Sequence, residues 1–416
     1  MIKRKLLGQL IDHLPRKEFT LIVGPRQAGK TTLMNSMRDT LARTGERTVY
    51  LNLDIDSDRP HFKSQDALLS KIRLEAGSGK VYVFIDEIQR KEDAGVFLKG
   101  LFDREPPCKF ILSGSGGLEL KEKIHESLAG RKKLFELNTL SFGEFADFRT
   151  DYRYTGKLPE YFGLEESGGR LLLEEYLKFG GYPRVVLEEK AADKNGVLEE
   201  IFRSCVEKDI ASLLRIERVD AFVEMARMLA VNTGRIMNYS DLAAQLNISI
   251  QTLKNYLYYG EKTFIFERLT PYFRNPRKEL VKAPVPYFRD LGLLNYAAGR
   301  LGAEPRPGEG GFLFQNFVYN SLKDTLRPGS AALHYWRSKE KAEVDFVAET
   351  GGGVVPFEVK YAALKKPAIE RSLRSFIGKY RPVRAFVVNI SLDLSVKLEG
   401  TEVIFLPYPR LLSDFL

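Results

Sequence analysis

The stretch from Gly24 to Thr32 limits most strongly what this chain can fold into. It reads Gly-Pro-Arg-Gln-Ala-Gly-Lys-Thr-Thr and directly follows the apolar run 19–23. Glycines in such a loop let backbone N–H groups converge on phosphate oxygens, a lysine supplies a mobile cation, and a hydroxyl group can bind Mg²⁺. A helix must follow, because its N-terminus adds further donors, and residues 31–43 have helical spacing. The pattern predicts a buried strand, a phosphate-binding loop and a helix that bind ATP or GTP.

Every residue of this loop is a candidate nucleotide contact. Lys30 is also expected to act in catalysis, and Thr31 to be a ligand of Mg²⁺. The alternative is an ordinary glycine-containing turn, which is disfavoured because all four fixed positions match in the right context. The candidate contacts are Gly24, Pro25, Arg26, Gln27, Ala28, Gly29, Lys30, Thr31 and Thr32.

An acidic pair, Asp86 and Glu87, closes the apolar run 81–85. Nucleotide hydrolases place one carboxylate here to hold Mg²⁺ and a second to polarise the attacking water. An acidic pair after an apolar run is also common in solvated turns, but the phosphate-binding loop upstream favours the catalytic interpretation. We predict Asp86 as a metal ligand together with Thr31, and Glu87 as the catalytic base.

A further apolar run, 109–112, ends in Ser113-Gly114-Ser115. Small polar residues at a strand end converge on a nucleotide bound at the same edge of the sheet. A hydroxyl there can sense the γ-phosphate or orient the water, and we assign this role to Ser115. The alternative is a plain Ser/Gly turn.

These motifs together resemble the prokaryotic AAA-superfamily ATPases whose C-terminal half is catalogued as a domain of unknown function. The resemblance spans nearly the whole chain and implies ATP rather than GTP as the nucleotide. Gly116-Gly117, where further serines are usual, and Thr139, where proline is usual, depart from the pattern. The motifs that carry it read Gly-Pro-Arg-Gln-Ala-Gly-Lys-Thr-Thr, Phe-Ile-Asp-Glu-Ile-Gln, Leu-Ser-Gly-Ser, Leu-Ala-Gly-Arg and Leu-Ser-Phe-Gly-Glu-Phe.

Arg131 stands in the Leu-Ala-Gly-Arg motif and fits the position of an arginine finger. Such a residue lends positive charge to the γ-phosphate during hydrolysis, either in its own subunit or in a neighbouring one. The role in a neighbour would require a homo-oligomer. An equally weighted alternative is a surface arginine beside Lys132 and Lys133.

The middle of the chain is predicted to hold a helical lid, 151–235, and a winged helix-turn-helix, 236–302. Ser240 and Ser249 are suitable N-caps for the two helices, and leucines at helical spacing face one core. Such modules bind DNA through the early turns of the second helix, and they also serve as protein-docking modules. The candidate DNA contacts are Gln251, Thr252, Lys254, Asn255, Arg274, Arg277 and Lys278.

Residues 303–416 are predicted to form a separate α/β domain of restriction-endonuclease-like fold. Asp345 and the triplet Glu358-Val359-Lys360 lie on two successive strands, where such domains point two carboxylates at Mg²⁺ and a lysine at the scissile phosphate. Relatives usually have a glutamate in the first helix, where this chain has Gln315, so metal binding should be weaker. The alternatives are a buried ion network, or a site that has lost its cleavage activity but still binds DNA.

The composition limits which binding partners and which cellular compartment fit this chain. The 416 residues carry a formal net charge of +9, which favours an anionic partner such as nucleic acid or an acidic protein surface. Two cysteines, four scattered histidines and no signal peptide or spanning apolar run fit a cytoplasmic protein.

The fold class is therefore α/β: an AAA-type parallel sheet over 1–150, then the lid, winged helix and nuclease-like domain. The leading hypothesis is a Mg²⁺-dependent ATPase that works on DNA. The alternatives are a signalling or assembly switch that binds protein partners, and an ATP-coupled nuclease.

Overall fold

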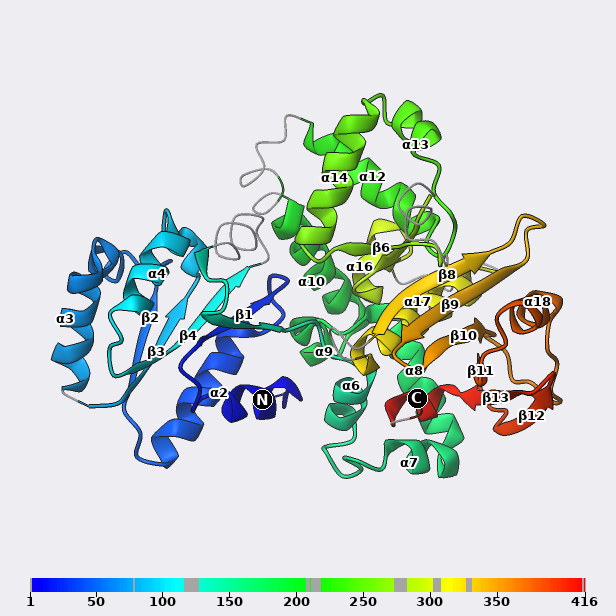
Figure 1. Ribbon diagram of the computed structural model, residues 1–416, viewed down its shortest axis with the longest axis horizontal. Helices are drawn as coiled ribbons and strands as arrows, with labels where there is room; N and C mark the ends of the chain where they lie inside the picture. Colours follow the sequence, from blue (N-terminus) through cyan, green and yellow to red (C-terminus); the bar gives the residue numbers. More distant parts are fainter. Residues whose placement is uncertain are drawn as a thin grey trace. The chain divides into compact units, whose positions relative to one another are not determined.

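The computed structural model describes residues 2–77, 79–115, 127–206, 210, 218–272, 283–301, 308–326, 331–413 and 415 (Figure 1). The chain divides into two compact units. The first comprises Met1–Leu140, Arg203–Glu217 and Tyr258–Phe264, and the second comprises Ser141–Phe202, Arg218–Leu257 and Ile265–Leu416. The predicted end of the first domain, at residue 150, differs from the observed division after Leu140.

The first unit is built on a sheet of five parallel strands in the order β2-β3-β4-β1-β5. The predicted parallel sheet of P-loop type is thus confirmed. Strands β1 and β3 are buried along their whole length, as expected for a parallel sheet covered on both faces. The strands are β1 (Phe19–Gly24), β2 (Thr48–Asn52), β3 (Val81–Asp86), β4 (Cys108–Ser115) and β5 (Lys132–Glu136).

Helices cover both faces of this sheet (Figure 1). Apolar residues of α1 (Leu6–Asp12) and α2 (Lys30–Arg43) pack with Ile22 and Phe84. Those of α3 (Gln65–Ala76) and α4 (Ala94–Asp103) pack on the other face, together with the short turns η1 (Arg59–Phe62) and η2 (Ile88–Arg90). Because all five strands are parallel, the loops after β1, β3 and β4 meet at one edge.

The second unit begins with helices. Asn238, not the expected Ser240, caps α13, because its side chain accepts a hydrogen bond from the Ser240 N–H at 3.0 Å. Ser249 does cap α14, accepting from the Thr252 N–H at 3.0 Å. The helices are α6 (Phe142–Arg149), α7 (Leu158–Leu164), α8 (Glu166–Phe179), α9 (Pro183–Leu187), α10 (Ala191–Ser204), α12 (Val219–Val231), α13 (Tyr239–Gln245), α14 (Ile250–Lys262) and α16 (Leu291–Ala297). Strands β6 (Phe266–Leu269) and β7 (Val285–Phe288) form an antiparallel pair.

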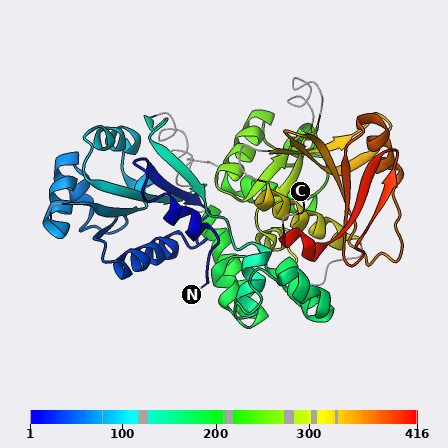
Figure 2. The same ribbon diagram turned by 60° about the horizontal axis from the view of Figure 1, so that its bottom comes forward.

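The rest of the second unit is a mixed six-stranded sheet in the order β12-β13-β11-β10-β9-β8. In both views α17 and α18 lie on opposite sides of this sheet (Figures 1 and 2). Among the described helices of either unit, none has both the length and the apolar character needed to cross a membrane. The elements are α17 (Glu309–Thr325), β8 (Ala331–Arg337), β9 (Glu343–Thr350), β10 (Gly353–Val359), α18 (Arg371–Tyr380), β11 (Arg384–Asn389), β12 (Leu394–Leu398), β13 (Thr401–Pro407) and η4 (Tyr408–Leu412).

Asn316 of α17 links the β6–β7 pair to the six-stranded sheet. Its side chain is 0% exposed, accepts from the Phe288 N–H at 2.8 Å and the Thr233 hydroxyl at 3.0 Å, and donates to the Phe288 carbonyl at 2.8 Å. These bonds satisfy buried polar groups of three segments at once. They explain why segments predicted as separate domains form one compact unit.

Replacing this side chain should therefore destabilise the second unit. Asn316→Ala would leave the buried Phe288 N–H without its acceptor and would remove one partner each from the Phe288 carbonyl and the Thr233 hydroxyl. We expect a loss of about 3 kcal/mol in the free energy of unfolding. Asn320→Ala is the matched control, because its bonds to Phe288 and Arg289 carbonyls are longer, 3.2 and 3.3 Å, and less buried. Urea unfolding followed by circular dichroism measures both; equal shifts in midpoint would contradict the linking role of Asn316.

Candidate functional site

The loop after β1 has the backbone that phosphate binding requires. Gly29, the N-cap of α2, has a φ of 94°, and Gln27 also lies in the left-handed region with a φ of 59°. A Cβ atom at Gly24 would lie closer to the carbonyl oxygen of Leu137 than real side chains allow. Glycine is therefore required at 24 by space and at 29 by conformation. This arrangement turns the start of α2 toward the edge where the strand ends meet.

Lys30 is held against this loop. Its side chain is buried, and Nζ donates to the carbonyl oxygens of Gly24 at 3.0 Å and Pro25 at 2.8 Å. The cation thus lies at the loop itself, as the sequence predicted. The other predicted contacts, Arg26, Gln27, Ala28 and Thr32, lie in the same loop or the first turn of α2.

Asp86 is the centre of the site. Only 1% of it is exposed, and its Oδ2 accepts from the Thr31 hydroxyl at 2.6 Å and the Tyr50 phenol at 2.8 Å. Its Oδ1 accepts from the Ser113 hydroxyl and from the Glu87 N–H, the latter at 3.1 Å. The structure thus brings together Thr31 and Asp86, the two predicted metal ligands. Four hydrogen bonds from four segments fix the carboxylate.

Tyr50 and Ser113 are site residues that the sequence analysis missed. Burial, and then the hydrogen bond to Asp86, raise the pKa of the Tyr50 phenol, so it stays a donor. Strands β2 and β3 are parallel with Asn52 opposite Asp86, which brings Tyr50 within reach. The small polar residues at the end of β4 could have indicated Ser113 as a site residue. Tyr50 could be recognised only once the pairing of β2 with β3 was known.

Glu87 follows Asp86 in a left-handed conformation with a φ of 57°. Its carboxylate accepts a hydrogen bond from the Gln89 side-chain amide. Burial raises the pKa of the Glu87 carboxyl above its ordinary value, although the Lys30 cation acts in the opposite direction. A carboxylate with a raised pKa beside a phosphate-binding loop is suited to accept a proton.

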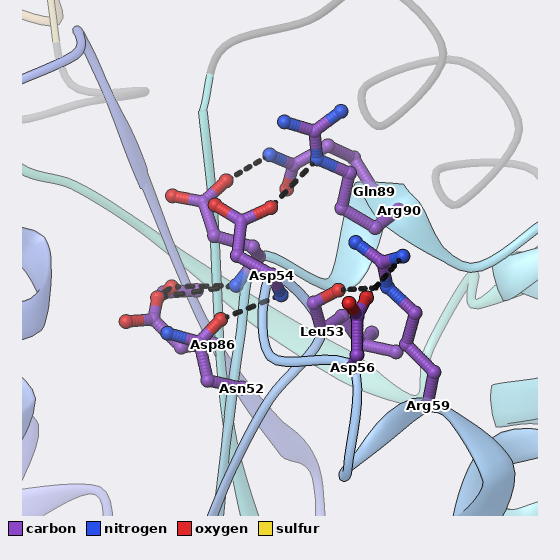
Figure 3. A network of polar contacts seen from close by, with 10 residues as sticks. Asn52, Leu53, Asp54, Asp56, Arg59, Asp86, Gln89 and Arg90 are labelled. Carbon is purple, nitrogen blue, oxygen red and sulfur yellow. Dashed lines mark hydrogen bonds and ion pairs between the residues drawn. The ribbon is translucent and has the colours of Figure 1, made fainter.

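Polar contacts tie the loop after β2 to the turn after β3 (Figure 3). Arg90 Nε lies 2.9 Å from Asp54 Oδ1, and the Asp54 N–H donates to the Asn52 side-chain oxygen at 2.8 Å. Arg59 donates to the Leu53 carbonyl at 2.9 Å and pairs with Asp56. Figure 3 shows these contacts beside Asp86, so they stabilise the loops on that side of the site.

Arg4 supports the phosphate-binding loop from the N-terminal segment. Its guanidinium donates to the Ala28 carbonyl at 2.8 Å and to the Asn138 carbonyl at 2.6 Å. These bonds join the loop to the segment after β5. The sequence analysis did not identify this residue, since nothing local distinguishes it from the neighbouring lysines.

The backbone of Ser115 pairs with Gly24, which places this residue beside the loop, but its side chain lies outside the described residues. Arg131 precedes β5, where Lys132 pairs with Phe19 at the start of β1, and its Nε lies 3.2 Å from Asp103. This is the sheet edge opposite the phosphate-binding loop. This position does not favour a finger role in the same subunit, and the ion pair with Asp103 is compatible with the alternative of a surface arginine.

The candidate DNA contacts of α14 lie on its outer side. Gln251, Lys254 and Asn255 are exposed, and Gln251 donates to Asn255 at 3.1 Å. Thr252 is half-buried and bonds to Ser249. The other candidates, Arg274, Arg277 and Lys278, lie outside the described residues.

Asp345, Glu358 and Lys360 do come together, on the antiparallel neighbours β9 and β10 and the residue that follows. Gln315 Nε2 donates to Asp345 Oδ1 at 2.7 Å, and the Val359 N–H donates to Asp345 Oδ2 at 2.7 Å. Lys360 Nζ lies 3.0 Å from Glu358 and 2.7 Å from Glu370. Burial and then Glu358 raise the pKa of Asp345.

This second cluster lacks one of the carboxylates that the resemblance implies. An amide donates to Asp345 at the place where the resemblance leads us to expect a glutamate. Within the described ranges, no group of three or more His, Cys, Asp or Glu side chains is arranged to hold a metal ion.

Comparison with known proteins covers most of the chain. Residues 16–146 match an AAA domain, and residues 170–304 and 310–411 match the domains of unknown function DUF8612 and DUF4143. An uncharacterized protein of Mycobacterium tuberculosis is 30% identical over 393 residues, 93% of this chain and 79% of that protein. An uncharacterized protein of Haemophilus influenzae is 26% identical over 423 residues, 97% of each chain.

Among solved structures, a DNA replication initiation factor matches 55% of this chain and 67% of its own, at 15% identity. The TM-score is 0.27, so this likeness carries no argument. The AAA domain supports the nucleotide-binding interpretation of the first unit.

Crowding at Gly24 gives a direct test of the loop. In Gly24→Ala the new methyl group would collide with the Leu137 carbonyl, displacing the loop, so we expect binding of a fluorescent ATP analogue to weaken at least about tenfold. Gly8→Ala in α1 is the control, since a Cβ there meets no atom within 4 Å. Unchanged affinity in Gly24→Ala would show that the nucleotide binds elsewhere.

Proposed function

Because the chain belongs to the family of AAA-domain proteins with the C-terminal domain of unknown function DUF4143, we propose that it hydrolyses ATP with Mg²⁺ and couples turnover to DNA binding. One observation carries the ATPase part: Lys30, Thr31, Asp86 and Glu87 meet at one edge of the parallel sheet. The coupling to DNA is the finer part of the proposal and rests on separate observations.

The phosphate-binding loop and α2 supply the charge stabilisation. Backbone N–H groups at the start of α2 and the Lys30 ammonium would contact the phosphate oxygens of ATP. During hydrolysis negative charge builds up on these oxygens, and donors already in position stabilise it without reorganising. The three bonds of Arg4 to carbonyls around the loop help to keep those donors in place.

Thr31 and Asp86 fit a magnesium site. A hydroxyl and a carboxylate whose oxygens lie 2.6 Å apart are the hard oxygen donors that Mg²⁺ prefers. When bound, Mg²⁺ would neutralise part of the charge on the phosphate oxygens. Tyr50 and Ser113 hold the Asp86 carboxylate in a fixed orientation, and so position it for this role.

Glu87 would act as the general base. Its carboxylate orients a water molecule and takes the proton as the water oxygen attacks the γ-phosphorus, while the bond to the leaving ADP oxygen breaks. The Glu87 N–H donates to Asp86, which fixes the backbone at this residue, and Gln89 orients the carboxylate. Charge from Arg131 of a neighbouring subunit would complete the site and would require a homo-oligomer.

The proposal that the protein acts on DNA rests on the net charge of the chain and on helix α14. The net charge of +9 favours an anionic polymer, and Gln251, Lys254 and Asn255 are exposed at the start of a helix that follows a short turn. The alternative is a switch that binds protein partners through the same helix pair. We do not extend the proposal to DNA cleavage, because Gln315 places an amide against Asp345.

ATPase rates with and without DNA test this proposal. We expect single-stranded, duplex or branched DNA to stimulate turnover several-fold, and we expect Lys30→Ala to abolish turnover.

Glu87→Gln should lower kcat by about 100-fold or more while ATP still binds, since the general base is lost. Hydrolysis surviving in Lys30→Ala would refute the site. No stimulation, and no electrophoretic retardation at low salt, would favour the protein-binding switch.

The raised pKa of Glu87 predicts the acid limb of the pH profile. Glu87 must be deprotonated to act as base, so kcat should fall as the pH drops through its pKa, which lies above the ordinary glutamate value because the side chain is buried. A profile of kcat measured with saturating ATP shows this limb. It should be missing from the residual activity of Glu87→Gln, and a limb that persists there would assign the titration to another group.

A further inference from the structure

A basic surface helix, α18, stands out in the second unit. The stretch Arg371–Arg384, which begins with α18, contains five basic and no acidic residues. Its apolar residues Leu373, Phe376 and Ile377 are buried in the core of the six-stranded sheet. Arg371, Arg374, Lys379 and Arg381 are exposed. We call these four residues the α18 basic face.

The cations of this face differ in their partners from several other exposed arginines of the second unit. Elsewhere in the second unit, three exposed arginines form ion pairs: Arg170 with Glu174, Arg184 with Glu200 and Arg227 with Glu224. In the part of the chain that the structure describes, no carboxylate pairs with the α18 basic face. Arg374 donates to the Ile369 carbonyl, and Lys379 lies over the Tyr380 ring at 5.2 Å. Three cations of α18 and that of its C-cap residue, Arg381, therefore form a positively charged surface, which the carboxylates of Glu340 and Glu399 border.

The N-terminal end of α18 adjoins the cluster of Asp345, Glu358 and Lys360. Glu370, the N-cap residue, accepts from Lys360 Nζ at 2.7 Å, and the Ser372 hydroxyl accepts from the Glu343 N–H at 3.3 Å. These contacts anchor the helix beside the ends of β9 and β10. The basic face therefore begins close to Lys360.

The other end of α18 adjoins the turn between β8 and β9. Lys379 lies 5.8 Å from the centre of the Trp336 ring of β8, and Lys339 and Lys341 of the turn are exposed. The cations Lys339 and Lys379 both help to lower the pKa of Glu340 in this turn, after its hydrogen bonds to the Glu340 N–H and Ser338. Basic positions thus span the whole helix, about 15 Å, and continue on the turn at Lys339 and Lys341, which flank Glu340.

We propose that the α18 basic face, with Lys339 and Lys341, binds the phosphate backbone of duplex DNA next to Lys360. This inference rests on the proposed coupling to DNA and names the surface that makes the contact. Arginine and lysine contacts to phosphates fix position without reading sequence. Non-specific single-strand binders present aromatic rings for base stacking, and the exposed positions of α18 within the described residues carry none, which favours a duplex.

Salt dependence of DNA affinity tests this surface in the full-length protein. We compare Arg371→Gln/Arg374→Gln/Lys379→Gln with the control Arg170→Gln/Arg184→Gln/Arg227→Gln, which removes equal charge from paired arginines. Anisotropy of a labelled duplex gives Kd over a series of NaCl concentrations. The α18 variant should bind at least about tenfold more weakly, with a log Kd against log salt slope reduced by about 2 to 3, since each lost phosphate contact contributes about 0.9. The control should change affinity less than about twofold.

The outcomes separate the two proposals. Equal weakening in both variants would mean that only net charge matters and would overturn the α18 surface. Wild-type duplex binding that the α18 variant retains would overturn it too, while coupling to DNA stands. If the wild type binds single-stranded DNA more tightly than duplex DNA, and the α18 variant loses this binding, the assignment to duplex DNA would be overturned. No binding of any DNA at low salt would overturn both proposals. A circular dichroism spectrum and a urea unfolding midpoint equal to those of the wild type confirm that the second unit of the α18 variant is folded.

Discussion

The first unit depends on the buried carboxylate of Asp86. A charge that is almost fully removed from water is destabilising unless several donors satisfy it. Here those donors come from α2, β2, β4 and the next residue of the chain: Thr31, Tyr50, Ser113 and the Glu87 N–H. The same four bonds therefore set the alignment of the central strands and the position of the groups proposed to bind metal and activate water. Asp86 thus contributes both to the fold of the first unit and to its proposed chemistry.

The second unit shows the opposite arrangement, since its potential contact surface is separate from its core. Asn316 and the aromatic pair Tyr287 and Tyr319, whose rings stack at 4.5 Å, hold α17 against the β6–β7 pair. Leu373 and Phe376 anchor α18 through the apolar side of that helix, and polar contacts of Glu370 and Ser372 hold its N-terminal end. Substitutions on the basic side of α18 therefore leave its buried apolar contacts in place. Such a surface can be adapted to a partner independently of the scaffold.

Local patterns were sufficient for the parts of the site that lie next to each other in sequence. The loop at Gly24 and the pair Asp86 and Glu87 follow buried strands, so the edge where they meet could be predicted. Tyr50 and Arg4 could not be, because their roles depend on strand order and on contacts across more than thirty residues or more than a hundred. The division between compact units after Leu140 could not be predicted from local patterns either, since it follows from the packing of α6 aromatic side chains with α8 in the second unit.

Glu87 combines two properties that work against stability. Its backbone is in the left-handed region, which costs a non-glycine residue about 1 kcal/mol, and its carboxylate is partly removed from water. Glycine at this position would relieve both. A library of variants selected for thermal stability alone should therefore lose the glutamate at this position early. Persistence of glutamate there under selection for activity would reflect a compromise between stability and catalysis, concentrated in one residue.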